Sequence, residues 1–174
     1  SQGRLHGLRD EDREAKLVSD ALRTERALRK AYQPAPTAFA EYVVKVLVCG
    51  GRDYADRAKV FEVLDYINQN RAKITLLIHG AASGADALGR DWAKARGVED
   101  DPYPALWTWL EAPNAVIKRR ADGTAYNANA GPDRNAKMLA VGKPDAVVAF
   151  PGGRGTNGMI EKARQAGVRV WEIG

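Results

Sequence analysis

The stretch Asp145-Ala-Val-Val-Ala-Phe-Pro-Gly-Gly-Arg-Gly-Thr156 decides the fold of this chain. Its first half is continuously apolar, as the strands of buried parallel sheets are, and its second half is a glycine turn that opens a segment with helical periodicity. The first turn of a helix carries unpaired N–H groups and about half a positive charge, so it can bind an anion. A turn that needs glycine only for its geometry is the alternative. Three glycines together with Arg154 and Thr156 favour a phosphate-binding loop, in which the threonine hydroxyl either caps the helix or contacts the anion.

Strand and helix patterns alternate along the rest of the chain. We expect strands at 43–49, 74–78, 98–103, 145–150 and 168–173, and helices at 55–70, 84–96, 131–141 and 156–167. Continuously apolar strands that alternate with helices indicate a parallel sheet covered on both faces. The predicted fold class is therefore α/β, a Rossmann-like parallel sheet with helices on both faces, preceded by an N-terminal helical arm.

Two segments stand outside the alternating pattern. Residues 1–36 are predicted to form a helical arm and a proline linker, since apolar residues recur at helical spacing before Gln33-Pro34-Ala35-Pro36. The arm is expected to pack on the nucleotide-binding domain, 37–174, or to mediate oligomerisation. Residues 104–130 form a connection long enough to be a lid, and Asp122-Gly123 predicts a hairpin turn within it. The basic run Lys118-Arg119-Arg120 and the tryptophans Trp107 and Trp109 could bind single-stranded nucleic acid. The alternative is a solvated hairpin that these two tryptophans anchor in the core.

The composition limits the classes of protein to which the chain can belong. A net charge of +5 and a pI of about 9.4 favour anionic partners, either nucleotides or nucleic acid. The single cysteine, Cys49, excludes an intrachain disulfide framework and predicts a cytoplasmic protein with a buried, unreactive thiol. Two histidines and one cysteine supply no ligand set for structural zinc, so no metal site is expected. No apolar run reaches the length of a membrane span and no secretory segment is recognised, so no membrane partner is expected.

Three glycine-rich turns follow predicted strands that end at the same edge of the sheet. Ligands of such folds bind beyond the carboxyl ends of the strands, where the strand order reverses. The sequence therefore predicts a phosphate-binding rim. Its predicted members are Gly50, Gly51, Arg52, Gly80, Ser83, Gly84, Arg134, Asn135, Gly152, Gly153, Arg154, Gly155 and Thr156. For Asn135 the alternatives are orienting the ligand and serving only as a helix residue.

Two carboxylates beside these turns, Asp86 and Asp53, are the candidate catalytic residues. Each also has a structural interpretation, because Ser83-x-x-Asp86 has the form of a capping box and Asp53 can form an Asx-turn or pair with Arg52. His79, at the end of a predicted strand, is expected to be a half-buried histidine whose hydrogen bonds are satisfied.

Four motifs together resemble the YspA-type branch of the SLOG superfamily. They are Gly50-Gly51-Arg52-Asp53-Tyr54, Ser83-Gly84-Ala85-Asp86, Ala130-Gly131-Pro132-Asp133-Arg134-Asn135 and Pro151-Gly-Gly-Arg-Gly-Thr156. The resemblance runs from about Val43 to Ile173, and the superfamily includes the LOG-type nucleotide phosphoribohydrolases and the DNA-processing protein DprA. It implies a Rossmann-like fold that binds a nucleotide or a nucleotide-derived ligand. Arg134 matches the arginine of the LOG motif R-x-x-x-M, with Met138 four residues later.

The chain departs from the LOG-type enzymes at one position. Those enzymes hydrolyse the N-glycosidic bond of a nucleoside 5′-monophosphate and carry a glutamate in the motif P-G-G-x-G-T-x-x-E, where this chain has Met159. Glu161 lies two residues on and is turned by about 200° around the helix, so the expected catalytic carboxylate is missing. The predicted sheet-facing stripe is Met159, Ile160, Ala163 and Ala166, with Glu161, Arg164 and Gln165 facing outward.

These observations predict a protein that binds a phosphate-bearing nucleotide or nucleotide derivative as a sensor or binding module, with no further cofactor. One alternative is a nucleotide N-glycosidic hydrolase with a variant active site. Another is a DprA-like binder of single-stranded nucleic acid. A homo-oligomer, formed through the N-terminal helix, is also expected, and the resemblance leaves either a bacterial or a phage origin open.

Overall fold

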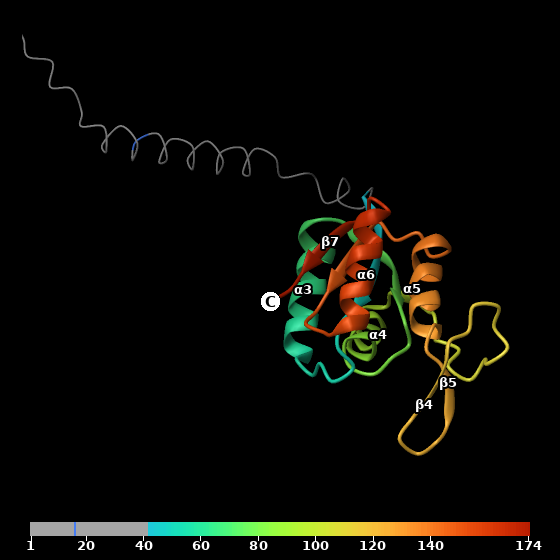
Figure 1. Cartoon of the computed structure of the whole chain (residues 1–174). Helices are drawn as coiled ribbons and strands as arrows, with labels where there is room; N and C mark the ends of the chain where they lie inside the picture. Colours follow the sequence, from blue (N-terminus) through green and yellow to red (C-terminus); the bar gives the residue numbers. More distant parts are fainter. Residues whose placement is uncertain (1–15, 17–41) are drawn as a thin grey trace, which may run out of the picture. The chain divides into compact units, whose positions relative to one another are not determined.

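The computed structural model describes Lys16 and residues 42–174, so the predicted helical arm and proline linker lie outside the described residues apart from Lys16. From Tyr42 onward, five strands form one parallel sheet in the order β3-β2-β1-β6-β7 (Figure 1). The strands are β1 (Val43–Cys49), β2 (Lys73–His79), β3 (Glu99–Pro102), β6 (Ala146–Ala149) and β7 (Arg169–Glu172). Every neighbouring pair in this sheet is parallel, which confirms the predicted α/β fold.

Two pairs of helices cover the two faces of this sheet. α3 (Arg57–Asn70) and α4 (Ala85–Arg96) pack on one face, and α5 (Ala130–Ala140) and α6 (Arg154–Gln165) pack on the other. Successive residues of a strand point to opposite faces. Val46 and Val48 of β1 accordingly join the core beneath α3 and α4, while Leu47 and Cys49 join the core beneath α5 and α6. Because both faces are covered, the central strands are apolar throughout, as their sequences indicate.

The boundaries of α3 and α4 follow from local chemistry. The carboxylate of Asp56 caps α3 by accepting a hydrogen bond from the Lys59 N–H at 2.9 Å. α4 ends at Gly97, which takes the left-handed conformation (φ 67°). Asp65 joins the two helices, since its carboxylate accepts from the buried Trp92 indole at 2.9 Å and from the Arg96 guanidinium at 2.8 Å.

The predicted hairpin is confirmed within the insertion. β4 (Ile117–Arg119) pairs antiparallel with β5 (Ala125–Asn127), and Gly123 in the turn has a φ of 86°. The hairpin projects away from the helices and the parallel sheet (Figure 1). The prediction of two core tryptophans is wrong for Trp109, whose side chain is 49% exposed, while Trp107 is half-buried. Buried Asn127 fixes the base of the hairpin instead, because its amide oxygen accepts from the N–H groups of Val116 and Asn129.

Candidate functional site

The candidate site lies where β1 and β6 are neighbours, because the strand order reverses there. Backbone hydrogen bonds bring the three glycine turns together at this point. The N–H of Gly51 donates to the carbonyl of Pro151 at 2.8 Å, and the carbonyl of Gly51 accepts from the Ala85 N–H at 3.1 Å. Gly84 has a φ of 73°, and a Cβ there would overlap the Gly51 carbonyl. The turns therefore form one connected structure, and the Gly51 N–H is used within it rather than left for a ligand.

The turns surround an open pocket of about 650 Å³, within the range of small-molecule sites. Most of the predicted site residues line it, including both candidate carboxylates. Those in its wall are Gly50, Gly51, Arg52, Asp53, Asp86, Arg134, Asn135, Gly153, Arg154, Gly155 and Thr156. Gly80, Ser83, Gly84 and Gly152 lie behind the wall and shape the loops that form it.

The N-terminus of α6 forms one end of the pocket. Gly153 is its N-cap and supplies no side-chain bond, and the first backbone bond runs from the Asn157 N–H to the Gly153 carbonyl at 3.0 Å. Within the described residues, the N–H groups of Arg154, Gly155 and Thr156 accordingly have no backbone partner. The three N–H groups and the positive end of the helix dipole can receive an anion.

Thr156 does not cap the helix, because it is the third residue of α6. Its side chain is 7% exposed, lines the pocket and takes no hydrogen bond within the part of the chain that the structure describes. A Cβ on Gly152 would overlap the Thr156 hydroxyl, so glycine there leaves room for the buried side chain. The capping role predicted for this hydroxyl is therefore wrong, and its contact with an anion stays a prediction.

Arg134 is held from several sides. Its terminal nitrogen donates to the Gly80 carbonyl and, at 3.4 Å, to the Tyr103 carbonyl, while its Nε donates to the Asn135 amide oxygen at 2.9 Å. A Cβ on Gly80 would occupy the space that the guanidinium fills. Burial and the nearby Arg52 charge lower the Arg134 pKa, whereas the Asp86 carboxylate acts in the opposite direction. Arg134 therefore joins α5 to the β2–α4 turn, and its guanidinium lies near that of Arg52 in the pocket wall.

Asn135 connects the same helix to α6. Its amide oxygen accepts from Arg134, and its amide nitrogen donates to the Gly155 carbonyl at 3.4 Å. Since Gly155 lies in the first turn of α6, Asn135 positions this turn relative to Arg134.

Asp86 organises the β2–α4 turn. Its Oδ2 accepts from the N–H groups of Gly80 at 3.0 Å and Ala82 at 3.2 Å. Burial raises the Asp86 pKa, although these bonds and the charge of Arg134 oppose the shift. The predicted capping box is wrong, because Gly84 is the N-cap of α4 and the Ser83 hydroxyl donates to the Arg52 carbonyl at 3.0 Å. Asp53 is exposed at the rim, and among the described residues it forms neither the expected Asx-turn nor a pair with Arg52.

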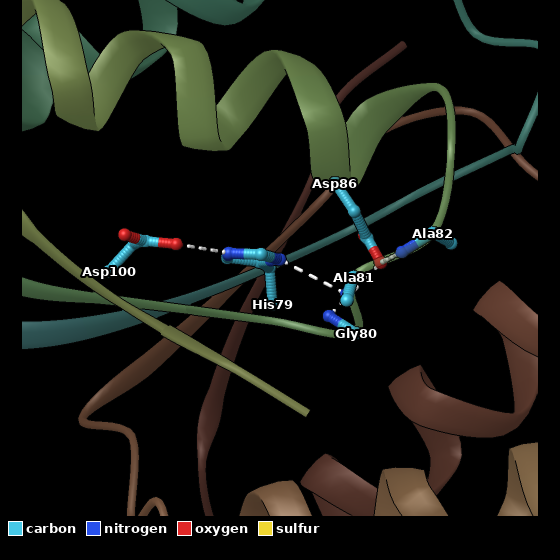
Figure 2. Close-up of polar contacts among 6 residues, drawn as sticks. All are labelled: His79, Gly80, Ala81, Ala82, Asp86 and Asp100. Atoms are coloured by element: carbon cyan, nitrogen blue, oxygen red, sulfur yellow. Dashed lines mark hydrogen bonds and ion pairs between the residues drawn. The ribbon is translucent and has the colours of Figure 1, made fainter. Parts of the chain in front are cut away.

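His79 supports the same turn, because its ring is bonded to the Ala81 backbone (Figure 2). It is not among the residues that line the pocket. The ring is only 2% exposed, so it is more deeply buried than predicted. Its Nδ1 accepts from the Ala81 N–H at 3.1 Å, which assigns the proton to Nε2, and Nε2 donates to the Asp100 carboxylate at 2.8 Å. Both ring nitrogens are satisfied, as expected. Ala81 itself has a φ of 56°, a conformation that costs a residue other than glycine about 1 kcal/mol or more.

Two further predictions concern the pocket floor. Burial raises the pKa of the Cys49 thiol to about 12, so its reactive form is strongly disfavoured. Met159 is 1% exposed and packs with Ile160 and Ala163 against the sheet, while Glu161 is exposed, as the helical pattern predicts. Ala166 is exposed rather than sheet-facing, because α6 ends at Gln165.

Sequence reasoning did not name Gly158 or Lys162, and it named Trp107 only as part of the insertion, yet all three line the pocket. The Trp107 ring lies 5.2 Å from the Arg52 guanidinium, and Gly131 is small enough to accommodate it. The sequence feature that could have identified Lys162 is its spacing. Positions three and four apart share a helix face, and Lys162 follows Met159 and Gly158 at those intervals.

Within residues 42–174 and Lys16, no three histidine, cysteine, aspartate or glutamate side chains gather in a way that could hold a metal ion. Nor does any helix in this part of the chain have the length and apolar character needed to cross a membrane.

Comparisons with known proteins agree with the fold and place the chain in a class. Residues 44–109 match the YspA, cpYpsA-related SLOG family, which confirms the relationship to the YspA-type SLOG branch. This match covers the first two glycine turns. The chain is also 29% identical over 138 residues to the gene 61 protein of Mycobacterium phage D29, and the aligned stretch covers 75% of this chain and 96% of that protein.

Proposed function

We propose that the protein binds a phosphate-bearing nucleotide or nucleotide-derived ligand in this pocket, as a sensor or binding module. The observation that carries the proposal is the uncapped N-terminus of α6 at one end of a pocket of about 650 Å³. The three N–H groups without backbone partners and the unbonded hydroxyl of the largely buried Thr156 are donors that phosphate oxygens satisfy. Membership of a SLOG family supports a nucleotide-related ligand.

The charge of the pocket supports the same class of ligand. Arg52, Arg134, Arg154 and Lys162 line it, against only Asp53 and Asp86. Arg134 and Asp86 lie close enough for each to affect the other's pKa, so their opposite charges offset each other. The remaining positive charge of the pocket comes from Arg52, Arg154 and Lys162. An anionic ligand relieves the repulsion among these cations.

Nucleotide hydrolysis is the second candidate function, and Asp86 is the observation in its favour. Its carboxyl group lines the pocket and has a raised pKa, as a general acid requires. The variant active site would then use Asp86 as the acid and Asp53, exposed at the rim, as the base.

Incubation with mixed nucleoside monophosphates, NAD and ADP-ribose, followed by mass spectrometry of the retained and released fractions, tests both functions. A binding module retains an unaltered nucleotide, and Arg154→Ala weakens retention while the exposed Arg164→Ala, on the outward face of the same helix, does not. Release of free base that stops in Asp86→Asn would establish the enzyme instead. If neither retention nor turnover occurs, both functions are wrong.

A further inference from the structure

The pocket-facing side of α6 contains two glycines that the protein's own packing does not explain. Gly155 and Gly158 line the pocket, and a Cβ built on either would meet nothing within 4 Å. Neither has the positive φ that favours glycine, as Gly84 and Gly97 do. Glycine is also among the poorest helix formers, and Gly158 lies inside the helix rather than at its end. What these two positions provide is unobstructed helix backbone along the pocket.

Lys162 follows on the same face of the helix. It is half-buried, lines the pocket and takes part in no ion pair within the residues that the structure describes. Helical side chains lean toward the N-terminus, so the lysine amine reaches back over Gly158. At 1.5 Å per residue, the Lys162 backbone lies about 10 Å along the axis from the first turn of α6, and the extended side chain shortens that gap to a few ångströms. The amine is thus a second positively charged group in the pocket, in addition to the N-terminus of the helix.

A polar side chain without a hydrogen-bond partner also supports an anionic ligand. Thr156, which is 7% exposed, lines the same pocket, and its hydroxyl has no hydrogen-bond partner among the described residues. Met159, between the glycine face and the sheet, places no carboxylate next to Lys162. Glu161 is exposed, is turned by about 100° around the helix from Lys162, and does not line the pocket. A phosphoryl group beside Lys162 therefore meets a cation and no neighbouring acid on α6.

We propose that Lys162 and the glycine face of α6 form a second anion subsite, so that the ligand carries at least two phosphoryl groups. The first occupies the helix N-terminus, and the ligand runs along Gly155 and Gly158 so that the second reaches the Lys162 amine. The inference rests on the proposed nucleotide-binding function and specifies its ligand. A nucleoside monophosphate fills only the first subsite, whereas a nucleoside diphosphate or a 3′,5′-bisphosphate fills both.

The test compares wild type with Lys162→Met by calorimetry, using the four ribonucleoside monophosphates, the matching diphosphates and the 3′,5′-bisphosphates as probes. We expect the best two-phosphate probe to bind at least ten-fold more tightly than its monophosphate, and Lys162→Met to remove that advantage, in line with the strength of hydrogen bonds to charged groups. Affinity for the monophosphate should change less than three-fold. Lys162→Arg keeps the charge and should restore most of the preference.

The matched control is Lys137→Met, which removes the same charge from an exposed position on α5 outside the pocket. It should leave the preference intact at constant salt. Equal affinity for one- and two-phosphate probes, or equal losses in Lys162→Met for both, overturns the second subsite while the proposed function stands. A complete lack of binding by wild type to every probe overturns the nucleotide-binding function itself. Thermal unfolding of each variant verifies that it is folded.

Discussion

Replacing Gly158 by alanine should make the protein more stable and a poorer binder. Glycine inside a helix is about 0.8–1 kcal/mol less favourable than alanine, and a Cβ at this position meets no atom within 4 Å. The φ angle of Gly158 is not positive, so alanine is not strained there. We therefore expect a gain of about 1 kcal/mol, which for a domain of this size raises the Tm by about 2–4 °C. The new methyl group occupies the space along which the ligand lies, so affinity for the best nucleotide probe should fall about ten-fold.

Gly84→Ala is the matched control in the same protein. Its φ is 73° and its Cβ would overlap the Gly51 carbonyl, so this exchange should lower stability. Guanidinium unfolding of both variants beside wild type, followed by nucleotide titration of the folded ones, provides the measurement. A loss of stability in Gly158→Ala would refute the conclusion that its Cβ position is open. A gain in stability with unchanged affinity would refute the conclusion that a ligand occupies the space.

Two further predictions concern titratable groups in the pocket. Because burial raises the folded-state pKa of Asp86 above its unfolded value, its ionisation opposes folding, and wild-type stability should fall as pH rises through that pKa. Asp86→Asn should flatten this fall in denaturant titrations across the acidic range, and identical pH profiles would contradict the assignment. Cys49, with a pKa of about 12, should resist a thiolate-specific reagent in the folded protein and react on unfolding. Labelling of native protein at the rate of a free thiol would contradict its burial.

The order of elements and the location of the pocket follow from local patterns in the sequence. A continuous apolar run such as Val43–Cys49 can be buried only with helices on both sides, and both faces of β1 are covered as this requires. Parallel strands place the turns that follow them at one edge, so the three glycine turns were predicted to meet, and their backbones do meet at Gly51.

Individual side-chain roles depend on contacts that a linear pattern does not contain. Ser83-x-x-Asp86 has the sequence of a capping box, but the left-handed Gly84 starts the helix one residue later and turns the Ser83 hydroxyl toward Arg52. The spacing of Lys162 from Gly158 does not show by itself that the lysine lines the pocket, because its place there depends on how far α6 extends beside the cavity. The sequence places Trp107 in the insertion. Its contact with Arg52 joins segments 55 residues apart, so no local sequence pattern could predict it.

The polar groups of the pocket divide into two sets with different consequences. The first set forms hydrogen bonds to backbone groups or within itself, and these bonds hold the glycine turns in place. Its members are Asp86, Arg134 and Asn135. The first turn of α6, Thr156 and Lys162 have donors that no described residue uses. Changes in the first set should therefore alter stability and its pH dependence before they alter affinity. Changes in the second set should alter affinity at nearly constant stability, since the folded protein without ligand gains nothing from those donors.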